Sequence, residues 1–192
     1  MNIAYITTPL IFLMSSVLSL YILAVVLRFM LQAVRADFRN PLCHALVTMT
    51  HPPLKFLRRI VPPIKQYDSA SIVLALLLQM VLNASIQMVL QKVAPNLFTL
   101  FVISFANLIG LALNVLIFVL FAQALFSWLN PQNYPPMMNV AASLTNPVLN
   151  VCRKIVPDIN GLDFSPLIAI LLLQTTKMLL LPPLEEQLAH LF

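Results

Sequence analysis

The chain is poor in charged residues, which make up 9% of its 192 positions. A soluble domain carries about 25% charged residues, so this chain has too few ionisable groups to cover a water-facing surface. Hydrophobic residues make up 60% of it. Several apolar runs reach the roughly 18–20 residues that cross a bilayer. A soluble globular protein is therefore excluded, and we predict one integral membrane domain without a separate soluble one.

Residues that carry enzymatic or metal chemistry are scarce too. The chain has 2 glycines, 2 cysteines and 3 histidines, with no phosphate-binding loop and no Ser/His/Asp cluster. Cys43 and Cys152 lack the CxxC spacing of metal or redox sites, and we expect both to be free, reduced thiols. These absences predict a protein that is not an enzyme, holds no metal or other cofactor, and has no nucleic-acid partner.

Four apolar segments are long enough to be transmembrane helices, at residues 9–29, 69–89, 97–126 and 164–181. The third exceeds the thickness of the hydrocarbon core, so we expect it to tilt or to extend into the interface. Of the 11 Lys and Arg residues, 7 lie between residues 28 and 65, and Arg153 and Lys154 lie in the second long connection. The positive-inside rule then predicts a multi-pass membrane protein, with both long loops facing the cytoplasm and both termini facing outward.

The chain also repeats itself. "THPPLKFLRRIVPP" occupies residues 50–63, and "TNPVLNVCRKIVPD" occupies residues 145–158. At this offset of 95, residues 50–79 align without gaps with residues 145–174, and 13 of the 30 pairs are identical. We therefore predict two repeats, 1–94 and 95–192, each made of span, cytoplasmic loop and span. Two spans per repeat make the halves parallel, related by a pseudo-two-fold axis along the membrane normal.

The repeated loops predict amphipathic helices at the membrane surface. In the first copy, Leu54, Leu57 and Val61 fall on one side of a helical wheel, together with Phe56 and Ile60, and the basic residues fall on the other. Those basic residues are Lys55, Arg58 and Arg59. Such a helix suits the headgroup plane of an anionic leaflet.

A second short helix is expected before each amphipathic one, which gives an interfacial two-helix hairpin at about residues 40–62 and again at about residues 135–157. Thr50 and Thr145 are expected to be N-caps, with Pro52 and Pro147 in the first turn. Pro62 and Pro157 would then end the second helix of each hairpin. These loops either set the topology alone or also form a docking face for lipid or protein.

Polar residues lie at the borders of the spans and within them. Asp68 and Asp163 open the second and fourth spans, where each is either an N-cap or an ion-pair partner of Arg58 or Arg153. The amides inside the predicted spans are Gln79, Asn83, Gln87, Asn107, Asn114 and Gln174. They either hydrogen bond between helices or line a polar conduit. Lys177 is expected to extend outward to the interface.

The repeat allows a test of whether the histidines form a metal site. His44 and His51 correspond to Asn139 and Asn146 in the second half. A site duplicated with the fold would have kept its ligands, so a histidine-based metal site is not expected.

The duplicated pattern T-x-P-x-L-x-x-x-R-x-x-x-P, with its downstream Asp and mid-span Gln, resembles the YggT family. The stretch "LFSWLNPQNYPPMMNVAASLTNPVLNVCRKIVPDINGLDFSPLIAILLLQ" matches the pattern closely, and the resemblance covers essentially the whole chain. It implies an inner-membrane protein of the two-copy bacterial form, associated with tolerance of osmotic and ionic stress. It also implies relatives linked to division-gene neighbourhoods, to assembly of membrane complexes or cofactors, and to nucleoid organisation in plastids.

Together these features predict an all-α, four-span, non-enzymatic accessory or scaffold protein whose hairpins dock a membrane or cytoplasmic partner. The residues expected to hold the hairpins in shape are Thr50, Pro52, Arg58, Pro62, Asp68, Thr145, Asn146, Pro147, Arg153, Pro157 and Asp163. The alternative is a channel or transporter for ions such as potassium, or for small solutes, along the intramembrane amides. The sequence leaves open whether the chain acts alone or as a homo-oligomer.

Overall fold

The computed structural model describes residues 4–38, 40–63, 68–91, 96–129, 136–154 and 163–189, and within these ranges the chain is helical and forms no strand. The elements are α1 (Ala4–Ala33), α2 (Pro41–Leu57), α3 (Ser69–Ile86), the π-helical turn η1 (Gln87–Gln91), α4 (Leu97–Leu129), α5 (Pro136–Cys152) and α6 (Ser165–Ala189). The prediction of an all-α protein is therefore confirmed over these residues.

Four of these helices are long and apolar enough to cross a membrane. Their spanning segments are Thr8–Ala33, Ser69–Val89, Leu97–Ser127 and Ser165–Pro182, which match the four predicted spans closely. Large apolar side chains point outward from them, and Phe12, Phe118 and Met178 are each at least 65% exposed. Such surfaces would be unstable in water, so these helices face lipid.

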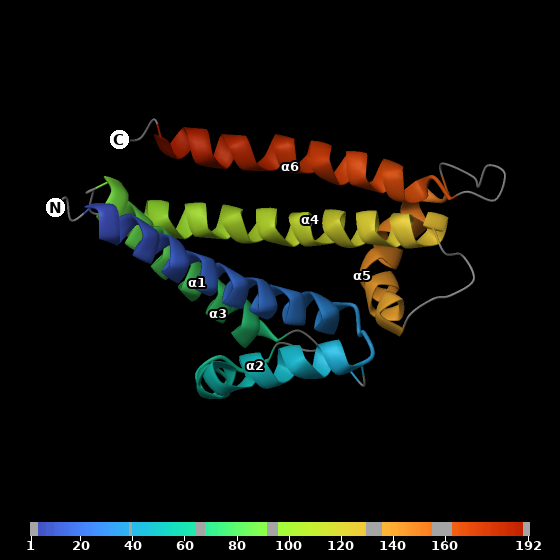
Figure 1. Cartoon of the computed structure of the whole chain (residues 1–192), viewed down its shortest axis with the longest axis horizontal. Helices are drawn as coiled ribbons and strands as arrows, with labels where there is room; N and C mark the ends of the chain where they lie inside the picture. Colours follow the sequence, from blue (N-terminus) through green and yellow to red (C-terminus); the bar gives the residue numbers. More distant parts are fainter. Residues whose placement is uncertain are drawn as a thin grey trace.

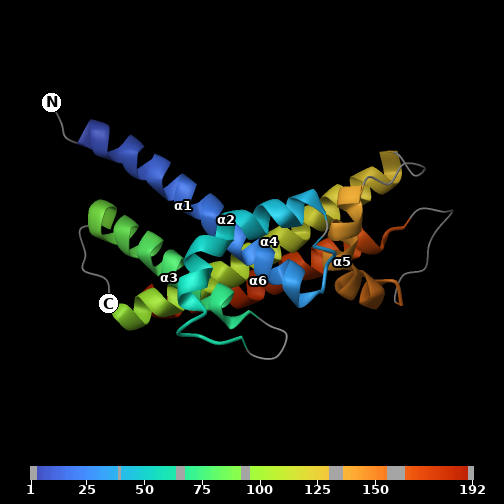
Figure 2. The ribbon, with the colours of Figure 1, turned by 90° about the horizontal axis from the view of Figure 1, so that it is seen from below.

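The four long helices form two pairs, α1 with α3 and α4 with α6, and α3 packs on α4 to join the pairs. Figure 1 shows α1 beginning and α6 ending at one end of the bundle, α5 toward the other end, and α2 below α1. From below, α1 crosses α4 and diverges from it toward the beginning of α1 (Figure 2). A strict two-fold axis would require a contact between α1 and α6 equivalent to that between α3 and α4. That contact is not among the main helix pairings, so the bundle is open on one side.

The buried core consists of small clusters rather than one large one. Ile22, Val25 and Leu82 belong to a cluster between α1 and α3, against which α4 packs. At the other end, Cys43 of α2 and Leu144 of α5 share a cluster with the end of α1. The surface helices α2 and α5 are thus packed into the bundle.

The prediction of two-helix hairpins is wrong. α2 continues through Pro52 and Pro53, and α5 continues through Pro147. The true N-cap of α2 is Asn40, whose side chain accepts a hydrogen bond from the Leu42 amide at 3.0 Å. Thr50 and Thr145 lie inside their helices and are not N-caps.

Buried contacts explain why α2 tolerates its prolines. Cys43, Thr50 and Leu54 are all buried at helical spacing, so one face packs on the bundle from before the prolines to after them. Pro53 cannot bond the carbonyl of Met49, and the Tyr21 hydroxyl donates to this carbonyl instead, at 3.4 Å. A hydrogen bond from α1 thereby replaces one of the helical hydrogen bonds that the prolines cannot form.

Candidate functional site

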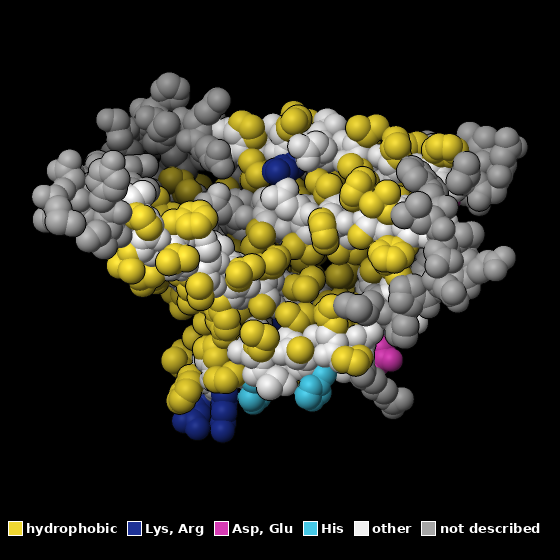
Figure 3. Space-filling view, viewed as in Figure 1, with side chains coloured by type: hydrophobic (Ala, Val, Ile, Leu, Met, Phe, Trp, Pro, Cys, Tyr) yellow, Lys and Arg dark blue, Asp and Glu magenta, His cyan; other side chains and the backbone are white. Residues whose placement is uncertain are grey.

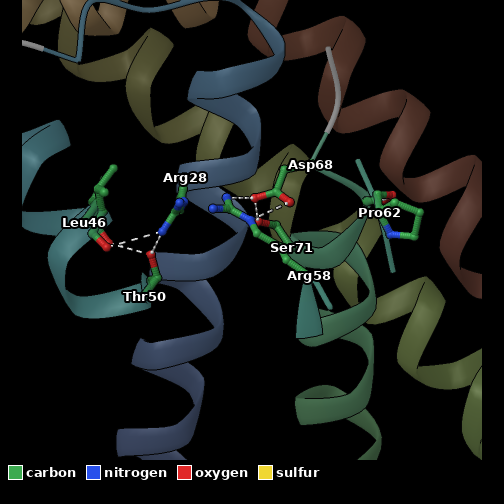
Figure 4. Close-up of polar contacts among 9 residues, drawn as sticks. Arg28, Leu46, Thr50, Arg58, Pro62, Asp68 and Ser71 are labelled. Carbon is green, nitrogen blue, oxygen red and sulfur yellow. Dashed lines mark hydrogen bonds and ion pairs between the residues drawn. The ribbon is translucent and has the colours of Figure 1, made fainter. Parts of the chain in front are cut away.

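The end of α2 is held to the start of α3 by an ion pair, which we call the first-half ion pair. Arg58 Nη2 donates to Asp68 Oδ2 at 2.5 Å, and Ser71 Oγ donates to the same oxygen at 2.8 Å. The Asp68 side chain is only 1% exposed, while that of Arg58 is 34% exposed. Figure 4 shows this group at the junction of α2 and α3. The predicted pairing is confirmed, and the Asp68 carboxylate does not cap a backbone amide of α3.

The second-half ion pair repeats this contact in a more open setting. Arg153 Nη2 donates to Asp163 Oδ2 at 2.7 Å. The other oxygen of Asp163 accepts the backbone amide of Ser165 at 2.9 Å, so this carboxylate both pairs and caps α6. The Arg153 and Asp163 side chains are 46% and 22% exposed, which makes this pair the weaker of the two.

A further pair of repeated contacts was missed by the sequence analysis. Arg28 of α1, buried to 5% exposure, donates from Nη1 to Thr50 Oγ1 at 2.7 Å (Figure 4). The Thr50 hydroxyl in turn donates to the Leu46 carbonyl at 2.6 Å. In the second half, Thr145 Oγ1 donates to Gln123 Oε1 of α4 at 2.5 Å. Arg28 and Gln123 are separated by the repeat offset of 95, which is the signal that could have found them.

Each surface helix is therefore fixed at two points, once to the span before it and once to the span after it. The remaining predicted residues play smaller parts. The Pro62 carbonyl accepts from Ser69 Oγ at 2.6 Å, which ties the α2–α3 connection to the start of α3. Asn146 is exposed on α5. Pro157 lies outside the described residues.

The outward face of α2 differs from the predicted wheel. Arg58 turns inward to Asp68, whereas Phe56 and Ile60 are 70% and 79% exposed. Lys55 and Arg59 are exposed beside them, so apolar and basic side chains share one outward strip, which runs from the last turn of α2 into the turn that follows it, at residues 55–60. Figure 3 shows basic and apolar side chains together at the end of the molecule that carries α2. The mixture arises because the tertiary ion pair, not the wheel, determines where Arg58 points.

The intramembrane amides form two groups. Asn83 Oδ1 accepts from Gln79 Nε2 at 3.4 Å and from Asn107 Nδ2 at 3.5 Å, and Asn83 Nδ2 donates to Ser104 Oγ at 3.0 Å. Lys177 Nζ donates to Asn114 Oδ1 at 2.8 Å, so the expectation that Lys177 extends to the interface is wrong. Gln87 begins the π-helical turn η1, and Gln174 is partly exposed on α6.

Comparison with known sequences identifies the family of this chain. The family described as CCB3/YggT matches residues 7–89 and again residues 102–184, with the same offset between copies as the repeat. The chain belongs to the CCB3/YggT family. An uncharacterized protein of Pseudomonas aeruginosa is 39% identical over 175 residues, covering 91% of this chain and 89% of the relative. An uncharacterized protein of Escherichia coli strain K12, named YggT, is 33% identical over 167 residues, covering 87% of this chain and 86% of the relative.

A third relative is named only by the position of its gene. This uncharacterized protein in the proC 3′ region of Vibrio alginolyticus is 34% identical over 170 residues, covering 88% of this chain and 91% of the relative. No solved structure matches the chain.

In this YggT-family chain both cysteines are free and buried, Cys43 in α2 and Cys152 in α5. Burial, with a smaller contribution from Asp37, raises the pKa of the Cys43 thiol and so lowers its reactivity. Among the described residues, no group of three His, Cys, Asp or Glu residues is placed to hold a metal ion.

Acid is expected to weaken both ion pairs. Burial alone would raise the pKa of Asp68, but hydrogen bonds from Arg58 and Ser71 outweigh it and hold the pKa below its ordinary value. The pKa of Asp163 is likewise lowered, because hydrogen bonds from Arg153 and Ser165 outweigh its burial. A carboxylate with a lowered pKa stabilises the fold above its unfolded pKa of about 3.9, and the contribution is lost as pH falls through the folded value.

We therefore expect the stabilisation from these pairs to be constant from pH 7 to about pH 5, to begin to fall near pH 4, and to be lost fully only below the lowered folded pKa values. Unfolding of the purified protein in mixed micelles, followed by circular dichroism across this range, measures it. Asp68→Asn provides the control, since it should lower stability at pH 7 and flatten the acid dependence. An unchanged acid dependence in this variant would contradict the assignment.

Proposed function

We propose that this chain is a non-enzymatic accessory or scaffold protein of the bacterial inner membrane, in which α2 and α5 form a docking surface on the cytoplasmic side. The observation that carries the proposal is the twofold anchoring of both helices. Arg28–Thr50 and the first-half ion pair fix α2, and their counterparts at the same register fix α5. Such contacts fix the positions of α2 and α5 on the bundle. If these segments only set the membrane topology, their basic residues alone would be sufficient.

The outward strip of α2 has the chemistry of a membrane-surface contact. Phe56 and Ile60 can enter the headgroup–acyl boundary while Lys55 and Arg59 meet anionic headgroups. Each basic residue near such a leaflet contributes about 1 kcal/mol. In α5 the counterpart of Phe56 is Val151, which is 59% exposed, so the second copy offers a weaker version of the same strip. A partner held against α2 would meet a fixed, mixed apolar and basic surface.

Membership of the CCB3/YggT family is consistent with a supporting role. We infer that effects on osmotic or ionic fitness arise indirectly, through a membrane complex that α2 and α5 help to position. The positive-inside distribution of Lys and Arg supports the cytoplasmic placement of both helices.

Site-specific photo-crosslinking in living cells tests this proposal. A photoreactive residue at Ile60 should give a discrete protein adduct, while the same residue at Phe118, a lipid-facing position on α4, should give lipid adducts alone. The adduct at Ile60 should fall at least several-fold when Arg58 and Arg153 are both replaced by Gln, because α2 and α5 then lose their anchors. Absence of any protein adduct at Ile60, or an adduct indifferent to both replacements, would refute the docking role.

A second candidate function, a conduit for small solutes, is favoured by one observation. A polar cavity lies among the four spans and contains several of the intramembrane amides. Lys177 lines this cavity, and its positive charge opposes passage of potassium, so a conduit here would suit anions or neutral solutes. Flux through the cavity can be measured together with binding to it, as described below.

A further inference from the structure

A cavity of about 310 Å³ lies between α1, α3, α4 and α6. Its polar lining comes from Ser19, Gln79, Asn107, Asn114 and Lys177, one or more from each of the four spans. Volumes near 300 Å³ are at the lower end of those found for small-molecule sites. The cavity is therefore large enough for a compact ligand.

The cavity lies near the middle of the membrane. Gln79 is ten residues from the start of α3, and Lys177 is twelve residues from the start of α6. At a rise of 1.5 Å per residue these positions lie about 15–18 Å from the ends of their helices, half of a core of about 30 Å. A carboxylate bound at this depth has left either the aqueous phase or the headgroup interface.

The repeat places the cavity at the pseudo-two-fold axis. Ser19 corresponds to Asn114, and Leu82 corresponds to Lys177, and all four residues line the cavity. α1 and α6, whose expected contact is not among the main helix pairings, both line the cavity. The two halves therefore line an open space between them, and among its described lining residues only Lys177 of the second half carries a charge.

That charge has no carboxylate partner among the described residues that line the cavity. Lys177 is the single Lys or Arg of α6. Its Nζ donates to the neutral Asn114 Oδ1. A cation within a membrane is expensive unless it is paired, and intramembrane ionisable residues are for this reason usually functional.

The other polar groups can serve a ligand as donors. Among the described residues, the side-chain amide nitrogens of Gln79 and Asn107 each donate one hydrogen bond, to Asn83 Oδ1, and an amide nitrogen carries two N–H groups. Ser19 adds a hydroxyl. Apolar walls from Ile22, Leu82 and Leu181 complete the cavity. This combination suits a ligand with one anionic end and a short hydrocarbon body.

We propose that the cavity binds a compact monocarboxylate, with the carboxylate on Lys177 and Asn114 and the hydrocarbon against the apolar wall. The ammonium group supplies the charge-assisted hydrogen bond, and the ligand supplies the counter-charge that the protein lacks at this depth. The carboxylate can come from a dissolved short-chain acid or from a fatty acid of the bilayer, and ligands of different chain length distinguish these sources. The proposal is independent of the docking role of α2.

The test uses the full chain in lipid nanodiscs and measures equilibrium binding of radiolabelled hexanoate and palmitate at pH 7, with hexanol as the neutral control. We expect saturable binding of a carboxylate and none of hexanol. Lys177→Met should weaken binding at least tenfold, and Lys177→Arg should retain most of it. Lys154→Met, which removes a similar charge from an exposed position just after α5, should leave binding unchanged.

A second variant guards against a folding defect in Lys177→Met. Ser19→Leu keeps the charge and fills the cavity from α1, so it should also abolish binding while the helical content and melting temperature are preserved. Binding of hexanoate alone assigns the site to dissolved acids, and binding of palmitate alone assigns it to the bilayer. No saturable binding of either acid, or equal binding by Lys177→Met and wild type, would overturn the proposal. Release of hexanoate from proteoliposomes, measured in parallel, would show that the bound anion is also transported.

Discussion

Replacing Arg58 with Gln is expected to lower the free energy of unfolding by about 3 kcal/mol, whereas Arg153→Gln should lower it by about 1 kcal/mol or less. The two arginines hold equivalent positions in the repeat but differ in the burial of their partners. Asp68 is 1% exposed and loses its counter-charge in a nearly closed site, while Asp163 is 22% exposed and can be solvated. Removing one partner of a buried pair leaves an uncompensated charge, which is the larger penalty.

Each half of the chain serves as the control for the other. Unfolding by SDS in mixed micelles, followed by circular dichroism, gives both values in the same protein under the same conditions. Asp68→Asn combined with Arg58→Gln should recover part of the loss, because the pair is then removed together. Equal effects of the two arginine replacements would show that burial of the aspartate does not determine the strength of the contact.

Replacing Thr50 with Val should lower the free energy of unfolding by about 2–3 kcal/mol, whereas Thr145→Val should lower it by about 1 kcal/mol. Val keeps the shape of Thr and removes the hydroxyl. In the first half this takes the acceptor from a buried guanidinium, that of Arg28 at 5% exposure, and in the second half it takes a donor from the neutral amide of Gln123. Hydrogen bonds to charged groups contribute more than those between neutral groups.

A double-mutant cycle separates the contact from the effect of each side chain. Arg28→Gln gives the first half the residue that the second half carries at the same register. In this background, Thr50→Val should lower the free energy of unfolding by no more than Thr145→Val does in the wild type. SDS unfolding again measures both values. A cost of Thr50→Val that is unchanged by Arg28→Gln would mean that the threonine acts through its helix alone.

The sequence by itself determined the membrane class, the four spans and the tandem repeat, and it offered the pairing of Arg58 with Asp68 and of Arg153 with Asp163 as one of two alternatives. These features depend on composition, on the length of apolar runs and on an offset that holds along the whole chain. All three can be counted in a linear sequence. The pairing followed because opposite charges recur at the same spacing at the same border of a span.

The tertiary structure alone decided the rest. Pro52 and Pro147 locally indicate the start of a new helix, yet α2 and α5 continue through them because buried faces on both sides of the prolines pack on the spans. Phe56 and Ile60 are exposed because Arg58 is drawn inward by a residue ten positions away. Arg28 meets Thr50, and Lys177 meets Asn114, across 22 and 63 residues of chain. Such contacts depend on how the helices pack, and the packing energy that favours them outweighs the local preferences that a sequence displays.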